Sequence, residues 1–236
     1  MGNIPKYIHY CWFGKGSIPK SNLKYIEGWK KIFPDYKLIL WNEDNFPLDN
    51  FSYAKEAYNA GKYAFVSDVA RIYALNKMGG IYLDTDVEVL RNPETLFSDK
   101  SLVLGSESVE AQTMGTGFIA YSPDHKISNK MLDYYSKCSF LNDDGTMNIK
   151  SNTKLMTEMM LECYGIGPSL EIQNVDDVIV FPRKYFTAFN TVTKRAEISS
   201  ETYCVHHFDA SWFSMDKKIK RYIKQHLARL MSRKNR

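Results

Sequence analysis

Residues 79–87 read GGIYLDTDV, a pair of glycines followed by three strand-forming residues and two aspartates one residue apart. Asp84 and Asp86 therefore stand where a buried strand runs out, with no lysine or arginine beside them. Side chains two apart in a strand point to the same face, so the two carboxylates are expected close together. Two negative charges that close repel each other, and a bound cation or protonation relieves the repulsion most simply. A solvated turn is the ordinary alternative, and the surrounding sequence has to decide between them.

The sequence on both sides of this stretch predicts helices that alternate with strands. Apolar residues recur at helical spacing from Phe65 to Met78, immediately before the glycine pair. Strands are expected at 6–13, 36–41, 81–84, 102–104, 118–121, 178–181 and 203–206, and further helices near 22–33, 127–136 and 154–163. This alternation predicts one α/β domain, in which ligands bind beyond the carboxyl ends of the strands. Asp84, Asp86, Trp12 and His206 all stand at such ends.

Composition indicates a soluble globular protein, because hydrophobic residues make up 44% of the chain and charged residues 25%. No apolar run approaches the roughly 20 residues that span a bilayer. The first residues lack the basic and apolar segments of a secretory signal, so none is expected. The four cysteines are scattered without a CxxC pair, which favours free thiols in a reducing cytoplasm over a disulfide or zinc framework.

The net charge of +4 hides an uneven distribution. Nine of the 31 Lys and Arg residues lie in residues 217–236, which contain no Asp or Glu, so residues 1–216 are mildly acidic. Apolar residues recur every three or four positions in the tail, which predicts a basic amphipathic helix after a domain of residues 1–216. That helix either packs on the domain or lies on the anionic inner leaflet of a membrane. The acidic body offers no continuous basic face for nucleic acid.

Three further features admit a structural and a functional interpretation. Asp68 and Arg71 lie three residues apart on a predicted helix, so their side chains share one face. They form either a surface ion pair or a functional pair, in which Arg71 binds phosphate or holds a carboxylate in place. Trp12 either packs in the core or offers a platform on which a nucleobase stacks. His206 and His207 follow a strand and point to opposite faces, so at most one faces the aspartates. Two aspartates and a histidine without cysteine suit Mn²⁺ or Mg²⁺, and the nitrogen favours manganese.

Four blocks of the sequence resemble, in order, the motifs of glycosyltransferase family 32. They are IPKYIHYCWFG, PDYKLILWNEDN, FVSDVARIYALNKMGGIYLDTDVEVL and YCVHHFDASW, and the resemblance covers about residues 4–213. The family contains DXD sugar transferases, among them capsular-polysaccharide enzymes and mannosyltransferases, and the glucosylating domains of large bacterial toxins are similar in the same blocks. The resemblance implies a GT-A-type fold that binds a nucleotide sugar on a mixed central sheet.

The resemblance also implies roles for individual residues. For binding the donor it implies Trp12 against the base, Asp68 and Arg71 on the sugar, Tyr82, Asp84 near the ribose, and Ser211 and Trp212 over the diphosphate. For metal it implies Asp84, Asp86 and His206, with His206 preferred to His207. The catalytic residues expected on this basis are Asp84, Asp86 and Arg71. One residue separates the serine from the tryptophan in the toxins, so the role of Trp212 is the least supported.

The function expected from these features is transfer of a hexose, with retention of configuration, from a nucleotide-diphosphate sugar to a glycan or lipid-linked glycan. The reaction would belong to surface or capsular polysaccharide synthesis at the cytoplasmic face of the membrane. A metal ion would neutralise the charge on the leaving nucleotide. The sequence offers no supported carboxylate nucleophile, which favours front-face attack. The alternatives are a metal-dependent hydrolase of nucleotide sugars and a carbohydrate-binding module.

Overall fold

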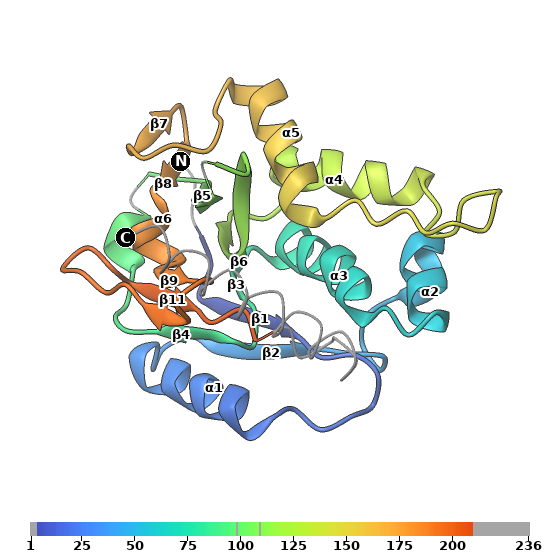
Figure 1. Ribbon diagram of the computed structural model, residues 1–236, viewed down its shortest axis with the longest axis horizontal. Coiled ribbons are helices and arrows are strands. Elements are labelled where there is room, and N and C mark those ends of the chain that lie inside the picture. The colour runs from blue at the N-terminus through green and yellow to red at the C-terminus, as the bar shows by residue number, and fades with distance from the viewer. Residues whose placement is uncertain (1–3, 98, 109, 210–236) are drawn as a thin grey trace, which may run out of the picture.

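The computed structural model describes residues 4–97, 99–108 and 110–209 of the chain. A seven-stranded sheet in the order β2-β1-β3-β6-β5-β8-β7 runs through its centre (Figure 1). The strands are β1 Tyr7–Cys11, β2 Lys37–Trp41, β3 Gly80–Leu83, β5 Leu102–Ser108, β6 Thr113–Tyr121, β7 Gln173–Val175 and β8 Val178–Phe181. β1 pairs in parallel with β2 and β3, whereas β6 is antiparallel to β3 and β5. The predicted α/β fold with a mixed central sheet is therefore confirmed.

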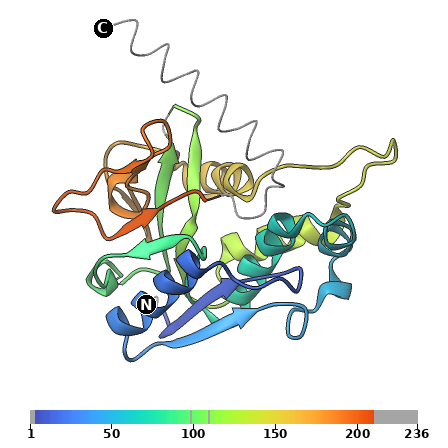
Figure 2. The ribbon, with the colours of Figure 1, turned by 60° about the horizontal axis from the view of Figure 1, so that its bottom comes forward.

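Helices cover both faces of the sheet, and two small two-stranded sheets complete the fold (Figures 1 and 2). The helices are α1 Lys20–Ile32, α2 Ser52–Asn59, α3 Tyr63–Met78, α4 Lys126–Lys137, α5 Asn152–Tyr164 and α6 Arg183–Phe186, with 3₁₀ turns at Leu48–Asn50 and Glu94–Leu96. The small sheets pair β4 Val87–Val89 with β11 Cys204–His206, and β9 Phe189–Asn190 with β10 Arg195–Ala196. In the described part of the chain, no helix has both the length and the apolar character that crossing a membrane requires.

The alternation of side chains along the strands divides the core into two layers. Ile119 and Tyr121 of β6 pack with α3, α4 and α5, while Phe118 and Ala120 pack with α1, β4 and α6. β5 divides in the same way, because Leu102 and Leu104 join the first cluster and Val103 joins the second. The central strands are thus buried on both faces, which leaves the strand ends as the place where polar side chains can meet a ligand.

The glycine pair between α3 and β3 is required by the geometry of the turn. Gly79 and Gly80 adopt φ values of 64° and 103°, a region that residues with a Cβ rarely adopt. A Cβ on Gly80 would lie 2.7 Å from the carbonyl oxygen of Tyr7. The pair therefore ends the helix and lets β3 run directly against β1.

Two expectations about strands need correction. The strand before the aspartates ends at Leu83, and Thr85 and Asp86 form the turn that leads into β4. The two carboxylates share one side because the chain turns there, and not because of strand alternation. The strand expected at 203–206 forms as β11, but it pairs antiparallel with β4 and not with the central sheet. This pairing brings the end of β11 to the aspartates, since His206 lies opposite Val87.

Candidate functional site

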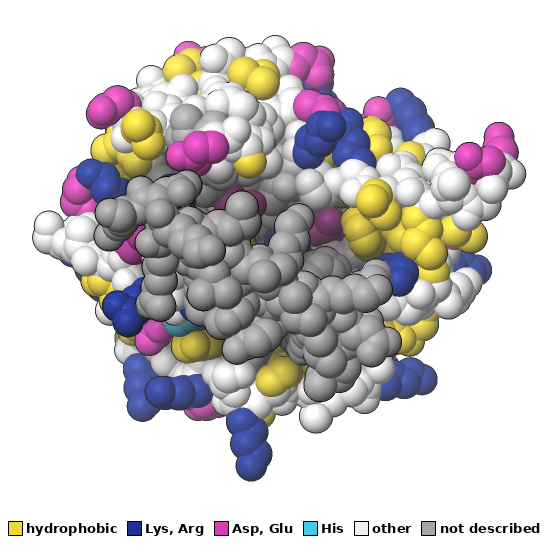
Figure 3. Space-filling view, in the orientation of Figure 1, with side chains coloured by type: hydrophobic (Ala, Val, Ile, Leu, Met, Phe, Trp, Pro, Cys, Tyr) yellow, Lys and Arg dark blue, Asp and Glu magenta, His cyan; other side chains and the backbone are white. Residues whose placement is uncertain are grey.

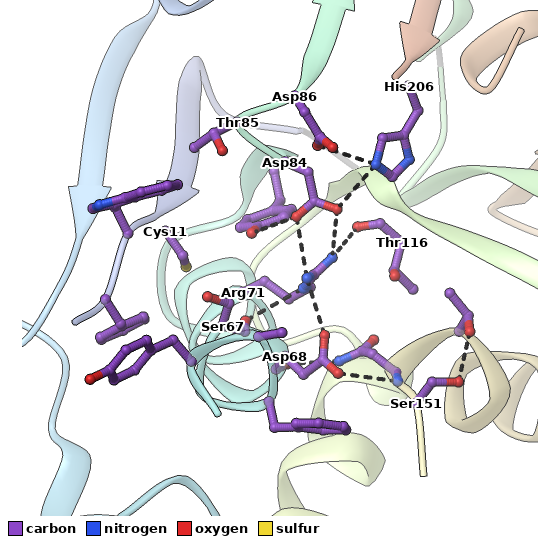
Figure 4. Close-up of a pocket in the computed structure, with 18 of the residues that line it drawn as sticks. Cys11, Ser67, Asp68, Arg71, Asp84, Thr85, Asp86, Thr116, Ser151 and His206 are labelled. Atoms are coloured by element: carbon purple, nitrogen blue, oxygen red, sulfur yellow. Dashed lines mark hydrogen bonds and ion pairs between the residues drawn. The ribbon is translucent and has the colours of Figure 1, made fainter. Parts of the chain in front are cut away.

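A pocket of about 490 Å³ opens beyond the ends of β1 and β3 (Figure 4). Its wall draws on six parts of the chain, which are the end of β1, α3, the turn after β3, the β5–β6 pair, the start of α5, and β11. The pocket contains Trp12, Asp68, Arg71, Tyr82, Asp84, Asp86 and His206, so the structure gathers every described residue expected at the site. Ser211, Trp212 and residues 217–236 lie outside the described residues.

Arg71 is a buried cation between two carboxylates, as Figure 4 shows. Its Nη2 lies 3.1 Å from Asp68 Oδ1 and 3.2 Å from Asp84 Oδ1, and its Nη1 donates to the carbonyl oxygen of Thr116 at 2.6 Å. Only 6% of the residue is exposed. Burial raises the pKa of the Asp68 carboxyl to about 6, although Arg71 opposes that shift. Arg71 therefore holds Asp84 in place, which is one of the roles expected from the sequence. Its guanidinium has little exposed surface left to bind a phosphate.

Tyr82 completes the support of Asp84. Its hydroxyl donates to Asp84 Oδ1 at 3.0 Å, and its ring lies 4.6 Å below the Arg71 guanidinium. The side chain is 1% exposed, so it acts on the pocket through Asp84. Arg71 and Tyr82 are both buried where they contact Asp84, while 24% of the Asp84 side chain remains exposed.

Asp84, Asp86 and His206 form a group whose ligand atoms all lie within 4.8 Å of one another. His206 Nε2 is 3.2 Å from Asp86 Oδ1 and 3.8 Å from Asp84 Oδ2. Burial opposes the imidazolium, but the charge and hydrogen bond of Asp86 outweigh it and raise the pKa of His206 to about 9. Burial likewise opposes ionisation of Asp86, yet His206 holds the pKa of that carboxyl at about 2. Two carboxylates and an imidazole are a fitting ligand set for a divalent cation, which would take the place of the proton on His206.

The neighbouring histidine faces away from this group. His207 Nε2 lies 2.9 Å from Glu88 Oε2, and its ring stacks on Tyr25 with centroids 4.9 Å apart. Gly117 of β6 makes room for the histidine that faces inward, since a Cβ there would lie 2.7 Å from His206 Nδ1. The absence of a side chain at Gly117 is therefore required for the position of His206.

Trp12 forms part of the pocket wall and belongs to neither large core cluster. Its Nε1 donates to the carbonyl oxygen of Gly16 at 2.7 Å, and its backbone N–H continues the pairing toward β2 through Trp41. Both interactions fix the indole at the end of β1. The platform interpretation fits this position better than the core interpretation does.

Sequence reasoning missed several residues of the pocket. Glu107 of β5 lines it, and burial raises the pKa of that carboxyl. Asn152, the first residue of α5, also lines it and donates from Nδ2 to the carbonyl oxygen of Asp68 at 2.7 Å. The serine that caps α5, Ser151, was a readable signal for a helix beginning there. Glu107 had the weaker signal of a carboxylate just past an apolar run.

Comparisons with known proteins agree with this geometry. Residues 19–103 match the family described as the glycosyltransferase sugar-binding region containing a DXD motif. An uncharacterized glycosyltransferase of Acanthamoeba polyphaga mimivirus is 29% identical over 221 residues, which cover 89% of this chain and 84% of that protein. Inositol phosphoceramide mannosyltransferase 1 of Schizosaccharomyces pombe is 25% identical over 144 residues, or 58% of this chain and 44% of that protein.

A solved structure shows the same fold. The PaToxG glycosyltransferase has a TM-score of 0.54 and 21% sequence identity, over 68% of this chain and 70% of its own. The family match, the relatives and the fold all point the same way as the motifs around Asp84 and Asp86. The chain is therefore a glycosyltransferase of the GT-A type, and its residues 19–103 match the sugar-binding region that contains the DXD motif.

Proposed function

We propose that this glycosyltransferase transfers a hexose from a nucleotide-diphosphate sugar to a glycan acceptor, depends on a divalent cation, and retains the anomeric configuration. The observation that carries the proposal is the group of Asp84, Asp86 and His206 on the floor of a pocket whose wall includes an indole. In a nucleotide-diphosphate sugar, the diphosphate would bind at the group of Asp84, Asp86 and His206, and the base would bind at the indole.

Asp84, Asp86 and His206 would hold the ion, which when bound would neutralise the charge on the leaving diphosphate. The donor set contains one nitrogen and two carboxylates, which favours Mn²⁺ and also accommodates Mg²⁺. Arg71 and Tyr82 hold the Asp84 carboxylate in position before any ligand arrives. Electrostatic groups fixed in advance cost no reorganisation during the reaction.

Trp12 would stack on the nucleobase, because its ring is part of the pocket wall and is held there by hydrogen bonds. Base stacking on an aromatic side chain contributes roughly 1–3 kcal/mol. Asp68 of α3 pairs with Arg71 and accepts a hydrogen bond from the backbone N–H of Asn152 at the start of α5. We assign it to the end of the pocket that would receive the sugar. For retention we propose front-face attack, in which the departing phosphate oxygen takes the proton of the acceptor hydroxyl.

The acceptor is proposed to be a surface or capsular glycan, carried on a lipid at the cytoplasmic face of the membrane. The family resemblance supports this choice. So does the name of the fission yeast relative, an inositol phosphoceramide mannosyltransferase, since that name specifies an acceptor carried on a lipid. The basic residues 217–236 would bring the domain to the anionic leaflet.

The test has two steps. Thermal unfolding with a panel of nucleotide sugars, each with Mn²⁺ or Mg²⁺, should show stabilisation that requires both ion and donor. The stabilising donor is then incubated with candidate glycan acceptors, and glycoside should form faster than free sugar. Nuclear magnetic resonance of the fresh product reads its configuration. Free sugar released at one rate with and without acceptor would instead establish the hydrolase alternative.

A further inference from the structure

Four carboxylates line the pocket, and only three of them have partners among the described residues. Asp68 and Asp84 pair with Arg71, and Asp86 pairs with His206. Glu107 lines the same pocket, yet in the described ranges no hydrogen bond or ion pair holds its carboxylate. A mostly buried carboxylate without a partner is costly to maintain, and such groups concentrate at functional sites.

Glu107 lies close to β6, where the neighbouring position is a glycine. A Cβ at Gly117 would meet His206 and Asp84, while a Cβ at Gly115 would lie 3.9 Å from the Cβ of Glu107. Glu107 shares the pocket with the group of Asp84, Asp86 and His206, and the charges of His206 and Asp84 act on its carboxyl.

Glu107 is not one of the candidate metal ligands. The candidate metal ligands found in the described part of the chain are Asp84, Asp86 and His206, whose ligand atoms meet within 4.8 Å, and Glu107 does not join them. A phosphate oxygen at the ion is joined through phosphorus and oxygen to the anomeric carbon of the donor sugar. Under the proposed function, the reacting end of the sugar would therefore lie next to the ion.

We propose that Glu107 is a catalytic residue whose carboxylate contacts the transferring sugar and stabilises the positive charge that develops at its anomeric carbon. This assignment rests on the proposed function, in which the bond from that carbon to the diphosphate breaks with its electron pair leaving on the phosphate oxygen. Glycosyl transfer of this kind passes through an oxocarbenium-like state. A carboxylate in a pocket of low dielectric stabilises such a cation far better than water does.

The first experiment replaces the carboxylate by an amide of the same shape. Glu107→Gln should lower kcat for transfer by about 100- to 1000-fold, the usual effect of losing one electrostatic group. The affinity for the nucleoside diphosphate with Mn²⁺ should stay within about twofold, since those groups bind elsewhere on the floor. Glu110→Gln is the matched control, because that exposed acid sits on the same hairpin and accepts a hydrogen bond from Ser108. It should leave kcat unchanged.

The second experiment restores a negative charge from solution. Sodium azide should accelerate donor cleavage by Glu107→Ala at least about tenfold and leave the wild type unaffected. Azide then forms a bond to the anomeric carbon as the bond to the diphosphate breaks, so a glycosyl azide accumulates. Its configuration reports the face of the sugar that Glu107 contacts.

Three outcomes would overturn the assignment. An unchanged kcat in Glu107→Gln, with normal transfer by the wild type, removes Glu107 and leaves the proposed function intact. A more than tenfold loss of nucleoside diphosphate affinity makes Glu107 part of the ion site. Absence of transfer and of donor cleavage in the wild type, across the donor panel, overturns the proposed function and with it the role of Glu107.

Discussion

Asp84 shows how much a single carboxylate at this site depends on its neighbours. Arg71 and Tyr82 both contact it, while His206 approaches it from β11. The sequence resemblance implied that Arg71 grips the donor sugar. The structure places its guanidinium against Asp68, Asp84 and a backbone carbonyl, so its effect on the donor would pass through those partners.

The two adjacent histidines provide a matched pair for testing the ion site. His206→Ala should raise the Mn²⁺ concentration needed for half-maximal activity by at least about tenfold, which is 1.4 kcal/mol. His207→Ala should change it less than about twofold, because His207 binds Glu88 away from the group. Titration of both variants with Mn²⁺ measures the difference. Equal effects, or the reverse order, would mean that the imidazole of His206 is not a ligand.

Trp12 can be tested against a tryptophan of the core. Trp12→Ala should weaken binding of the nucleoside diphosphate by roughly 1–3 kcal/mol while the unfolding temperature changes little. Trp29→Ala should do the opposite, since Trp29 is fully buried and its loss costs about 3–5 kcal/mol of folding free energy. Calorimetric binding and thermal unfolding of the two variants separate the cases. Unchanged nucleotide affinity in Trp12→Ala would refute the stacking role.

At the scale of elements, β6 supplies the floor on which the site is built. Gly117 of this strand lies against the site, because a Cβ there would meet His206 and Asp84. Gly117→Ala should displace the imidazole of His206, because the added methyl would lie 2.7 Å from Nδ1. We expect weaker Mn²⁺ binding and lost transfer in a protein that still folds.

The control for that substitution lies on α1. A Cβ on Gly28 would meet nothing within 4 Å, so Gly28→Ala should bind Mn²⁺ normally and gain up to about 1 kcal/mol of stability. Calorimetric titration with Mn²⁺ compares the two variants. Normal ion binding by Gly117→Ala would show that the strand yields more easily than its contacts imply.

A second element-level feature is His9, which joins β1 to β2 and to the end of α3. Trp41 Nε1 donates to its Nδ1 at 3.1 Å, and its Nε2 lies 2.8 Å from the carbonyl oxygen of Gly79. Those partners require the neutral ring with its proton on Nε2. Burial lowers the pKa of His9 from 6.5 to about 4, although the bond to Gly79 opposes the shift.

This pKa predicts a loss of stability in mild acid. The folded pKa is below the unfolded one, so the unfolded chain takes up the proton first and stability falls as pH drops from 6.5 toward 4. His9→Gln can donate and accept the same bonds without titrating. The free energy of unfolding of the wild type, relative to that of this variant, should fall by about 2 kcal/mol between pH 7.5 and pH 5. Denaturant unfolding at both pH values measures it, and a constant difference would contradict the buried neutral state.

At the scale of the whole molecule, the sequence predicted the architecture better than it predicted the site. Alternating apolar runs and the glycine pair after Met78 were sufficient for the α/β fold, because each signal is local. Asp84 and Asp86 could be found for the same reason. Glu107 and Asn152 could not, since their place in the pocket depends on contacts between segments far apart in the chain. Likewise, β11 was predicted as a strand, but its pairing with β4 is a long-range contact.

The uneven charge of the chain gives the last prediction. Full-length protein should sediment with anionic vesicles at low salt and be released at high salt, because each Lys or Arg near such a surface contributes about 1 kcal/mol. A chain of residues 1–216 should remain in the supernatant and keep its activity on small soluble acceptors. Neutral vesicles are the control. Full-length protein that stays in the supernatant at low salt would show that residues 217–236 are not an anchor.

The pairing of β11 with β4 also determines when the ion site can be completed during biosynthesis. The ribosome releases the chain from its N-terminus, so Asp84 and Asp86 emerge well before His206. The last strand of the central sheet, β8, ends at Phe181, and all of its partners precede the third ligand. The nascent protein can therefore assemble its sheet without an ion. Under the proposed function, ion loading then follows synthesis of β11, and a cell short of the ion would accumulate folded protein that still lacks it.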